Sequence, residues 1–451
     1  MSQKVLVAGT GKSGIAAAKL LLAMGGEVVL YDGNDKLDPE KIKENFEEDA
    51  KVTIVLGELT RPDLLGVELS IISPGIPLDA PFVPVLDEAK IPIWSEIQLA
   101  YHVAKGKLIA ITGTNGKTTT TALTGAIMKT FFDEVFVVGN IGIPYTDVAL
   151  DTTDKSVTVA EVSSFQLETI MDFHPNVSAI LNITPDHLNR HGTMENYIEV
   201  KERVAVNQTE DDCIVLNYDD KVLREFGEKK DLKPKVIFFS STQTLKEGMY
   251  LDGDMMIYAH DGKKEGVLNV KTDMQLLGKH NYENVMAAVA MSIRMGVPMD
   301  LIRKAVKEFK AVEHRIEFVL ERSGVRYYND SKGTNPDAAI KAVQAMVTPT
   351  VVIGGGYDKQ SSYEEWIASF GDTVKCLVLL GATADKIEQT ARKAGFTNII
   401  RVDSLQEAVR VSAAQAESGE AVLLSPACAS WDMFKSYEQR GTLFKEYVNQ
   451  L

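Results

Sequence analysis

The sequence predicts an α/β protein built from three domains. A short apolar strand, a glycine-rich turn and a helix with apolar periodicity follow one another at residues 4–24 and again at residues 108–129, and strands alternate with helices once more in the last third of the chain. Strands that alternate with helices form parallel sheets. We therefore predict a Rossmann-like domain over residues 1–95, a central P-loop ATPase-like α/β domain over residues 96–312 and a C-terminal Rossmann-like domain over residues 313–451.

The composition is that of an ordinary globular protein with an acidic surface. The 451 residues are 45% hydrophobic and carry a net charge of -15, which argues against nucleic-acid binding and membrane-surface binding. No apolar run approaches the ~18 residues of a membrane span, and the first residues show no signal-peptide pattern. The three cysteines have no metal-ligand spacing and indicate no disulfide framework. We expect a cytoplasmic protein.

The first domain opens with a dinucleotide-type turn. Residues 4–8 form an apolar strand, the pattern Gly-x-Gly-x-x-Gly occupies residues 9–14, and a second strand at residues 27–31 ends at Asp32. Taken alone, this unit predicts NAD or FAD. A UDP-sugar would suit it equally, because it also carries a pyrophosphate and a ribose.

Further strands of this domain are predicted at residues 52–56, 69–73 and 91–94. The turn Ser-Pro-Gly-Ile-Pro at residues 73–77 contains Gly75 and follows the carboxyl end of one of them. Ligands of open α/β sheets bind at that edge.

A phosphate loop is predicted at residues 113–118, Gly-Thr-Asn-Gly-Lys-Thr, between the strand at residues 108–111 and a helix. The glycines let backbone N–H groups face an anion, and the helix start adds about half a positive charge. Lys117 supplies a full charge, and Thr118 can hold Mg²⁺. The pattern is shorter than the usual Walker A motif, and the alternative is a glycine turn before an ordinary helix.

Two later strands end in polar residues that could reach this loop. Glu161 follows the strand at residues 156–160 and is a candidate Mg²⁺ ligand, although a strand-end glutamate is more often only solvated. His187 follows the strand at residues 177–183, where a structural histidine is the alternative. Lys201 lies on a predicted helix, and nothing local distinguishes it from a surface lysine.

The remainder contains an appended sheet and the third domain. Residues 218–271 are polar and predict the appended sheet with its loops. Asn281 and Asn284 begin a long helix, and their amides could read an adenine edge or cap the helix. In the third domain a helix starts at Asn335-Pro336, and the predicted strands are residues 326–329, 350–353, 375–380, 398–402 and 421–424.

In this order, the motifs resemble the Mur ligases over the whole length of the chain. The motifs that carry the resemblance span residues 113–119, 139–142, 161–167, 182–187, 280–281, 313–315, 329–334 and 425–430. The last two favour the D-glutamate-adding branch. The Asp-Asn-Pro-Arg motif of the diamino-acid-adding relatives does not appear in the sequence.

The resemblance implies a reaction and its participants. ATP would phosphorylate the carboxylate of UDP-N-acetylmuramoyl-L-alanine, and the amine of D-glutamate would attack the acyl phosphate to form an amide. This is a step of peptidoglycan precursor synthesis, and thus of cell-wall formation, cell shape and cell division. It implies ATP, two Mg²⁺ ions and no NAD, small-molecule substrates, no nucleic-acid or membrane partner, and a monomer.

The resemblance also implies roles for particular residues. The catalytic group would be Lys117, Glu161, His187 and Lys201. ATP would be held by Gly113, Thr114, Asn115, Gly116, Lys117, Thr118, Thr119, Asn281, Asn284, Arg315 and Asp330. The UDP-sugar would be held by Gly11, Lys12, Ser13, Gly14, Asp32, Gly75, Asn140 and His187. D-Glutamate would be held by Lys332, Thr334, Lys359, Ser430 and Tyr437. The metal ligands would be Thr118, Glu161, His187 and a carbamylated Lys201.

Other functions stay open at the level of sequence. A related Mur ligase could add another amino acid, and a folylpolyglutamate-synthetase-like enzyme would share the phosphate loop. A nicotinamide oxidoreductase would use Gly9, Gly11, Gly14 and Asp32 but would leave the phosphate loop without a task. An ATP-gated binding protein would leave Glu161 without one.

Overall fold

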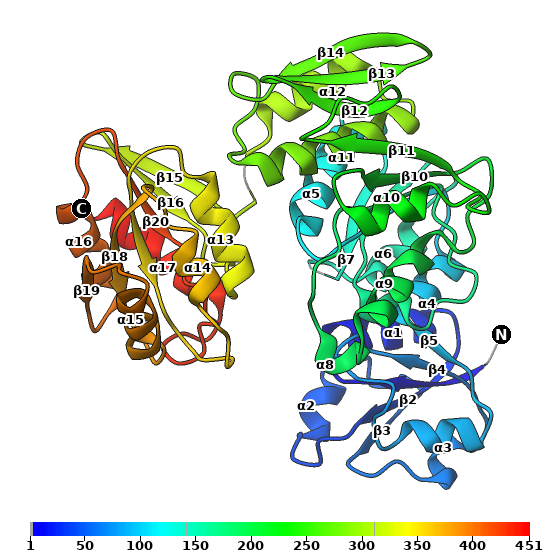
Figure 1. Cartoon of the computed structure of the whole chain (residues 1–451). Helices are drawn as coiled ribbons and strands as arrows, with labels where there is room; N and C mark the ends of the chain where they lie inside the picture. Colours follow the sequence, from blue (N-terminus) through cyan, green and yellow to red (C-terminus); the bar gives the residue numbers. More distant parts are fainter. Residues whose placement is uncertain (1–2, 141, 311) are drawn as a thin grey trace. The chain divides into compact units, whose positions relative to one another are not determined.

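The computed structural model describes residues 3–140, 142–310 and 312–451 (Figure 1). Ile141, in the middle of the Gly139–Gly142 motif, and Ala311, beside the predicted boundary at residue 312, lie outside the described residues. The chain forms two compact units, Met1–Asn269 with Glu283–Val306, and Val270–Tyr282 with Lys307–Leu451. Among the described helices none has the length and apolar character that a bilayer crossing requires.

The N-terminal sheet is the predicted Rossmann-like one. Its strand order is β3-β2-β1-β4-β5, and every neighbouring pair is parallel. The strands are β1 (Lys4–Ala8), β2 (Glu27–Asp32), β3 (Val52–Leu56), β4 (Val67–Ile72) and β5 (Ile93–Ser95), and the helices are α1 (Lys12–Ala23), α2 (Pro39–Lys43) and α3 (Val83–Glu88). The strand order reverses beside β1, so the glycine turn after β1 lies at the point where such sheets bind ligands.

The central sheet has the order β14-β13-β12-β11-β10-β9-β6-β8-β7. Its strands are β6 (Lys107–Thr112), β7 (Val135–Gly139), β8 (Val157–Glu161), β9 (Val177–Ile180), β10 (Cys213–Asn217), β11 (Lys235–Ser240), β12 (Gly248–Asp252), β13 (Met255–His260) and β14 (Lys263–Asn269). Along this order, every neighbouring pair from β7 to β12 is parallel, and the pairs β12–β13 and β13–β14 are antiparallel. The sheet predicted for residues 218–271 is therefore a continuation of the central sheet.

Helices cover this sheet and connect its strands. They are α4 (Glu96–Val103), α5 (Lys117–Met128), α6 (Tyr145–Val148), α7 (Ser164–Leu167), α8 (Leu188–His191), α9 (Met194–Glu202), α10 (Lys221–Gly227), α11 (Lys279–Arg294) and α12 (Met299–Glu308). Strand β9 ends at Ile180, three residues before the predicted end, because the chain turns there towards the phosphate loop: the Leu181 N–H donates to the Thr112 carbonyl at 3.1 Å.

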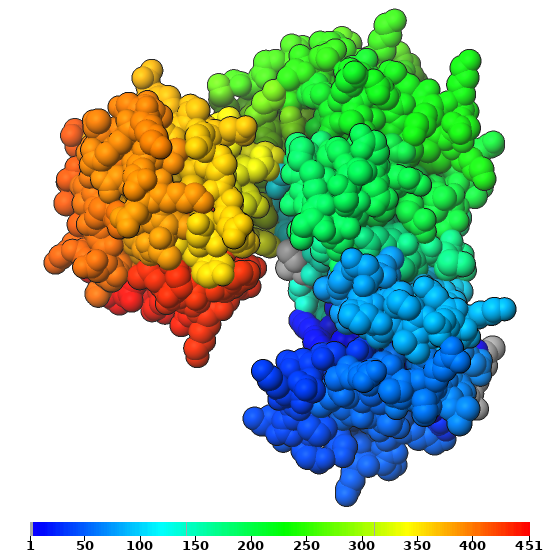
Figure 2. Space-filling view, turned by 60° about the horizontal axis from the view of Figure 1, so that its bottom comes forward, coloured from blue at the N-terminus to red at the C-terminus, as the bar shows by residue number. Residues whose placement is uncertain are grey.

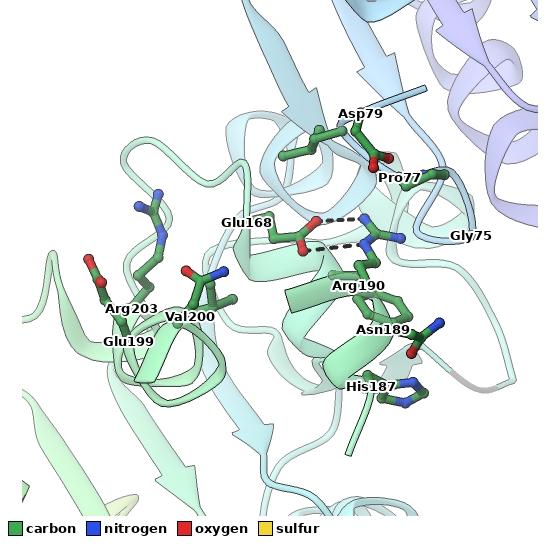
Figure 3. A pocket seen from close by; sticks show the side chains of 13 residues that line it. Gly75, Pro77, Asp79, Glu168, His187, Asn189, Arg190, Glu199, Val200 and Arg203 are labelled. Carbon is green, nitrogen blue, oxygen red and sulfur yellow. Dashed lines mark hydrogen bonds and ion pairs between the residues drawn. The ribbon is translucent and has the colours of Figure 1, made fainter. Parts of the chain in front are cut away.

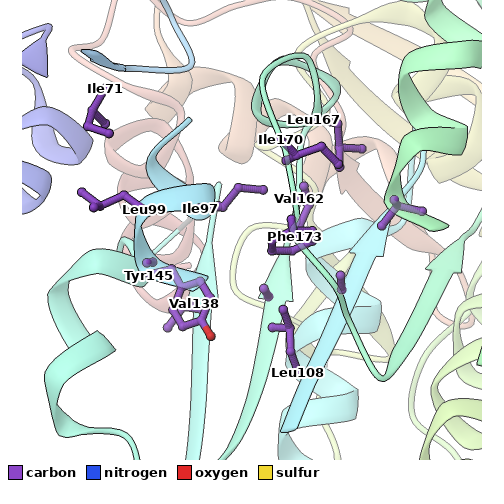
Figure 4. Close-up of a cluster of buried hydrophobic side chains, with 14 of the residues drawn as sticks. Ile71, Ile97, Leu99, Leu108, Val138, Tyr145, Val162, Leu167, Ile170 and Phe173 are labelled. Carbon is purple, nitrogen blue, oxygen red and sulfur yellow. The ribbon is translucent and has the colours of Figure 1, made fainter. Parts of the chain in front are cut away.

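The first two sheets share one hydrophobic core. Buried side chains of β1 and β4, such as Val5 and Ile71, belong to the same cluster as Ile97 of α4 and Leu108 of β6 (Figure 4). The blue N-terminal residues accordingly pack directly against the neighbouring cyan residues in the space-filling view (Figure 2). A ligand bound between these sheets would therefore be held by one contiguous body.

The C-terminal unit contains a sheet of order β15-β16-β20-β17-β18-β19, with β15 antiparallel and the other pairs parallel. The strands are β15 (Glu317–Arg322), β16 (Val325–Asn329), β17 (Thr350–Gly354), β18 (Val374–Leu379), β19 (Ile399–Arg401) and β20 (Ala421–Leu424), and the helices are α13 (Pro336–Ala345), α14 (Glu364–Ala368), α15 (Ala384–Lys393), α16 (Leu405–Gln415) and α17 (Tyr437–Asn449). The sequence interpretation did not include β15 or α17.

Candidate functional site

The phosphate loop adopts the predicted strand–turn–helix geometry. Gly113 and Gly116 have φ values of 142° and 87°, and α5 begins at Lys117. The Lys117 ammonium folds back and donates to the carbonyls of Gly113 and Thr114, both at 2.9 Å. Asn284 approaches closely, because a Cβ on Gly116 would lie 2.2 Å from the Asn284 Oδ1. The loop therefore places a lysine, a helix start and an amide together.

Two residues that sequence reasoning did not single out hold the loop in place. Asn182 accepts from the Asn115 N–H at 2.8 Å and donates to the Asn115 carbonyl at 3.0 Å. The hydroxyls of Thr114 and Tyr197 lie 3.0 Å apart. Asn182 belongs to the motif at residues 182–187, but its side-chain role becomes visible only when β9 and the loop are adjacent.

Lys201 is buried beside the loop and is not a surface lysine. Its ammonium donates to the Gly113 carbonyl at 2.9 Å and lies 4.8 Å from the centre of the Tyr197 ring. Burial lowers its pKa well below the ordinary value, the Lys117 charge lowers it further, and Asp186 opposes both effects. The amine therefore carries a proton less readily than an exposed lysine does.

Glu161 ends β8 and is 2% exposed. Among the described residues, the one hydrogen bond that its carboxylate accepts comes from Asn140 at a long 3.4 Å. A buried carboxylate with so weak a partner is poorly compensated by the protein itself. The Glu161 carboxylate is therefore suited to binding a cation.

His187 faces a large cavity beside these residues. It has a left-handed backbone with φ 53°, its ring lies 4.9 Å from that of Phe165, and burial lowers its pKa. The cavity has a volume of about 950 Å³ (Figure 3), and its lining residues include Gly75, Pro77, Asp79, Glu168, Asn189 and Arg190. The histidine therefore faces the cavity as a neutral imidazole near neutral pH.

A second cavity, of about 870 Å³, lies at the N-terminal glycine turn and is lined by Gly9, Gly11, Asp32, Ser73 and Ile76 among others. The Asp32 carboxylate accepts from the Thr10 N–H and hydroxyl and from the Asn34 N–H. Burial alone would raise the pKa of Asp32, but these hydrogen bonds outweigh it and lower the pKa. The cavity thus carries an ionised carboxylate beside a glycine turn.

The other residues of this predicted site are distributed around the turn. A Cβ on Gly14 would lie 1.8 Å from the Gly9 carbonyl oxygen, which explains the glycine. Ser13 follows Lys12 in the first turn of α1, and the Lys12 ammonium donates to the Gly142 carbonyl of the central domain. Lys12 is exposed, and its ammonium nevertheless connects the two domains.

In the C-terminal unit, Asp330 and Arg315 lie near each other. Asp330 is buried and accepts from the Ser425 hydroxyl at 2.8 Å. Burial raises its pKa to about 7, while Arg315 and the Ser425 bond act in the opposite direction. Asn281 also belongs to this unit, and its amide donates to the Leu277 carbonyl at 2.6 Å.

Each of the two lysines predicted to bind the amino acid lies near an aromatic ring. The Lys332 ammonium lies 5.8 Å from the centre of the Tyr437 ring, and the Lys359 ammonium lies 5.3 Å from the ring of Trp431. Ser430 precedes Trp431 and is buried. Thr334 follows Lys332 in the same loop, where its N–H donates to the Lys332 carbonyl at 2.8 Å.

Arg440 connects the two loops that carry these residues, and sequence reasoning did not assign it a role. It is 2% exposed and donates to the Ser331 hydroxyl and carbonyl and to the carbonyls of Cys428 and Ala429. Burial lowers its pKa to about 10. The sequence signal for Arg440 is weak: it lies in residues 425–441, a segment rich in polar residue types that follows the last predicted strand.

Comparisons with known proteins agree along the whole chain. Residues 3–95 match the Mur ligase MurD-like N-terminal domain, residues 111–292 the Mur ligase middle domain, and residues 314–428 the Mur ligase glutamate ligase domain. Two relatives named UDP-N-acetylmuramoylalanine–D-glutamate ligase are similar to it. The one from Lachnospira eligens is 55% identical over 100% of this chain and 99% of its own, and the one from Lachnoclostridium phytofermentans is 54% identical over the same shares.

Solved structures support the fold. UDP-N-acetylmuramate-alanine ligase MurC from Thermotoga maritima matches with a TM-score of 0.62 at 17% identity, over 99% of both chains. MurF ligase from Thermotoga maritima, solved in complex with ADP, matches with a TM-score of 0.59 at 17% identity, over 94% of this chain and 95% of that one. The expected three-domain α/β fold is confirmed, and the oxidoreductase alternative is not favoured. The chain belongs to the Mur ligase family of ATP-dependent ligases, in the branch of the UDP-N-acetylmuramoylalanine–D-glutamate ligases.

Proposed function

We propose that the protein joins D-glutamate to UDP-N-acetylmuramoyl-L-alanine, with conversion of ATP to ADP and phosphate, in peptidoglycan precursor synthesis. The observation that carries this proposal is the 55% identity, over the full length of the chain, to a relative with that name. In the reaction the substrate carboxylate attacks the γ-phosphorus of ATP and ADP leaves. The D-glutamate amine then attacks the acyl carbon and phosphate leaves, so that one amide bond is formed for each ATP consumed.

The first step brings two anions together, and the phosphate loop supplies the countercharge. Unit charges of the same sign 4 Å apart repel by ~4 kcal/mol at an effective dielectric constant of 20. The Lys117 ammonium is held at the loop by two of its carbonyls, where it would face a bound phosphate. The N–H groups at the start of α5, from Gly116 to Thr119, would face the same anion, as in other phosphoryl-transfer sites, whereas those of Thr114 and Asn115 donate to Asn182.

We assign metal binding to Thr118, Glu161, His187 and Lys201, with two Mg²⁺ ions as the expectation. The fit rests on the buried and weakly paired Glu161 carboxylate and on the neutral form of His187 that burial favours. Mg²⁺ would neutralise phosphate charge as a Lewis acid. Lys201 could ligate only as a carbamate, which forms from the neutral amine. Its lowered pKa is consistent with that modification.

The UDP-sugar is assigned to the two cavities described above. The Gly11–Gly14 turn with Asp32 would hold the nucleotide, in the same way that such turns hold pyrophosphate and ribose. Lys12 and Ser13 lie within this turn and are assigned to the same ligand. Gly75 and His187 line the other cavity, of about 950 Å³, and Asn140 contacts Glu161, so the acyl end of the substrate would extend towards the metal site.

The remaining assignments belong to the C-terminal unit and helix α11. Asn281 and Asn284 are proposed to contact the nucleotide base of ATP, and Arg315 and Asp330 to contact the rest of ATP. Lys332, Thr334, Lys359, Ser430 and Tyr437 are proposed to bind D-glutamate. Two lysines there match its two carboxylates. We place the domain boundaries near residues 95 and 312 and propose a cytoplasmic monomer that binds neither nucleic acid nor membrane.

Phosphate release from ATP and Mg²⁺ tests the proposal. The assay contains UDP-N-acetylmuramoyl-L-alanine and one member of a panel of D- and L-amino acids. Release that requires both the UDP-sugar and D-glutamate is expected. Release with another amino acid would refute the amino-acid assignment, and no release with any of them would refute the ligase reaction.

A further inference from the structure

The loop at residues 73–77 forms a wall shared by the cavity at the glycine turn and the cavity that contains His187. Ser73 and Ile76 line the cavity at the glycine turn, whereas Gly75 and Pro77 line the cavity that contains His187. On its N-terminal side the loop is fixed by backbone contacts, since the Ser73 N–H donates to the Ala8 carbonyl at 3.0 Å. A ligand that occupied both cavities would cross this loop.

Arg190 holds the middle of the loop from the opposite side. Its Nη1 donates to the Pro74 carbonyl at 2.7 Å, and its Nη2 and Nε donate to the two oxygens of Glu168 at 2.5 and 3.3 Å (Figure 3). The guanidinium carbon lies 4.0 Å from the centre of the Phe165 ring. The side chains of Arg190 and Glu168 are each only 12% exposed.

This set of contacts requires an arginine. One planar guanidinium makes a forked bond to a carboxylate, a bond to a carbonyl and a face contact with a ring, and a lysine ammonium cannot make all three at once. Pro74 belongs to the N-terminal domain, whereas Phe165, Glu168 and Arg190 belong to the central domain. A side chain of the central domain, Arg190, therefore holds a loop of the N-terminal domain in place.

We propose that Arg190, oriented by Glu168 and Phe165, is a positioning residue for the UDP-sugar: it sets the 73–77 loop so that both cavities accept one substrate. This inference rests on the proposed function. It concerns substrate affinity and not the reacting atoms, because each of the three nitrogens of the Arg190 guanidinium already donates one hydrogen bond to a protein group. Arg190→Lys should release Pro74 while keeping a cation next to Glu168.

The experiment measures steady-state phosphate release and equilibrium binding of UDP-N-acetylmuramoyl-L-alanine for the full chain and its variants. For Arg190→Lys we expect the KM and Kd of the UDP-sugar to rise at least about tenfold, because a hydrogen bond from a charged donor is lost. We expect kcat and the KM of ATP to stay within about twofold. Glu168→Gln should raise the same KM by less, and the double variant should be no worse than Arg190→Lys alone.

Arg303→Lys is the matched control. Arg303 lies in helix α12, away from both cavities, and it also combines carboxylate and backbone partners: it donates to the carboxylates of Glu265 and Asp300 and to the carbonyls of Gly266 and Val267. It should leave all kinetic constants unchanged. The inference would be overturned if Arg190→Lys left the KM and Kd of the UDP-sugar unchanged. It would also be overturned if the variant raised the KM of the UDP-sugar, of ATP and of D-glutamate by the same factor. If Arg190→Lys does not fold, the UDP-sugar KM of Glu168→Gln and of Phe165→Leu is compared with that of the variant carrying both changes. Additive changes in this KM would then overturn the inference. Inactive wild-type protein would instead refute the proposed reaction.

Discussion

Gly116→Ala tests the close approach between the phosphate loop and helix α11. The new Cβ would lie 2.2 Å from the Asn284 Oδ1, so the amide would have to move by about 1 Å to restore a normal contact. The backbone at φ 87° adds strain of about 1–2 kcal/mol for a residue with a side chain. A displacement of about 1 Å in a binding group can cost up to about 100-fold in rate. We therefore expect kcat/KM for ATP to fall about 10–100-fold.

Gly296→Ala separates the two effects. Gly296 has nearly the same φ, 83°, but a Cβ there would meet nothing within 4 Å. Both variants should lose about 2–8 °C in melting temperature, as expected for 1–2 kcal/mol in a domain of this size, and only Gly116→Ala should lose activity. Phosphate release at varied ATP concentration and thermal melting provide both readings. If Gly116→Ala keeps its kcat/KM for ATP within twofold of Gly296→Ala, the assignment of Asn284 to the nucleotide site is wrong.

Three further outcomes are expected. Lys117→Ala should retain less than about a tenth of the wild-type rate with an unchanged melting curve, because a positioned charge at the γ-phosphate contributes several kcal/mol; a higher residual rate would place the phosphate elsewhere. Asp330 has a folded pKa raised to about 7, so its contribution to stability is present below about pH 4 and is lost as pH rises towards 7. The melting temperature of Asp330→Asn relative to wild type should therefore rise between pH 5 and 8, by the equivalent of at most about 3 kcal/mol, and a flat difference would contradict the burial argument. Burial raises the thiol pKa of Cys213 to about 12 and also raises the pKa of Cys376 and Cys428; iodoacetamide at pH 8 should thus modify the native protein far more slowly than the denatured one, as mass spectrometry would show.

Local patterns were sufficient to predict the glycine turns and the parallel strands. The apolar runs that became β1 and β6 are continuous because both faces of a parallel sheet are buried. Gly113 and Gly116 were informative because they take backbone conformations that other residues avoid. Family resemblance then assigned roles to Glu161 and Lys201, which local sequence could not distinguish from solvated residues.

The contacts that sequence reasoning missed depend on partners far away in the chain. Arg190 bonds Pro74, and Arg440 bonds Ser331, over 116 and 109 residues respectively. No periodicity encodes such a pair, since the acceptors are backbone carbonyls that any residue provides. Strand β15 was missed for another reason: its sequence, Glu-Phe-Val-Leu-Glu-Arg, is an exposed edge with charged ends, which lacks the continuous apolar run of the central strands.

The position of β20 in the C-terminal sheet has a consequence for biosynthesis. This strand, Ala421–Leu424, is the last of the chain, yet it lies between β16 and β17 and joins the two halves of the sheet. Until it leaves the ribosome, β16 and β17 each present an unpaired edge, and such edges promote association between chains. A chain that ends before residue 421 should therefore be insoluble, and amino-acid binding should be the last property that the nascent protein acquires.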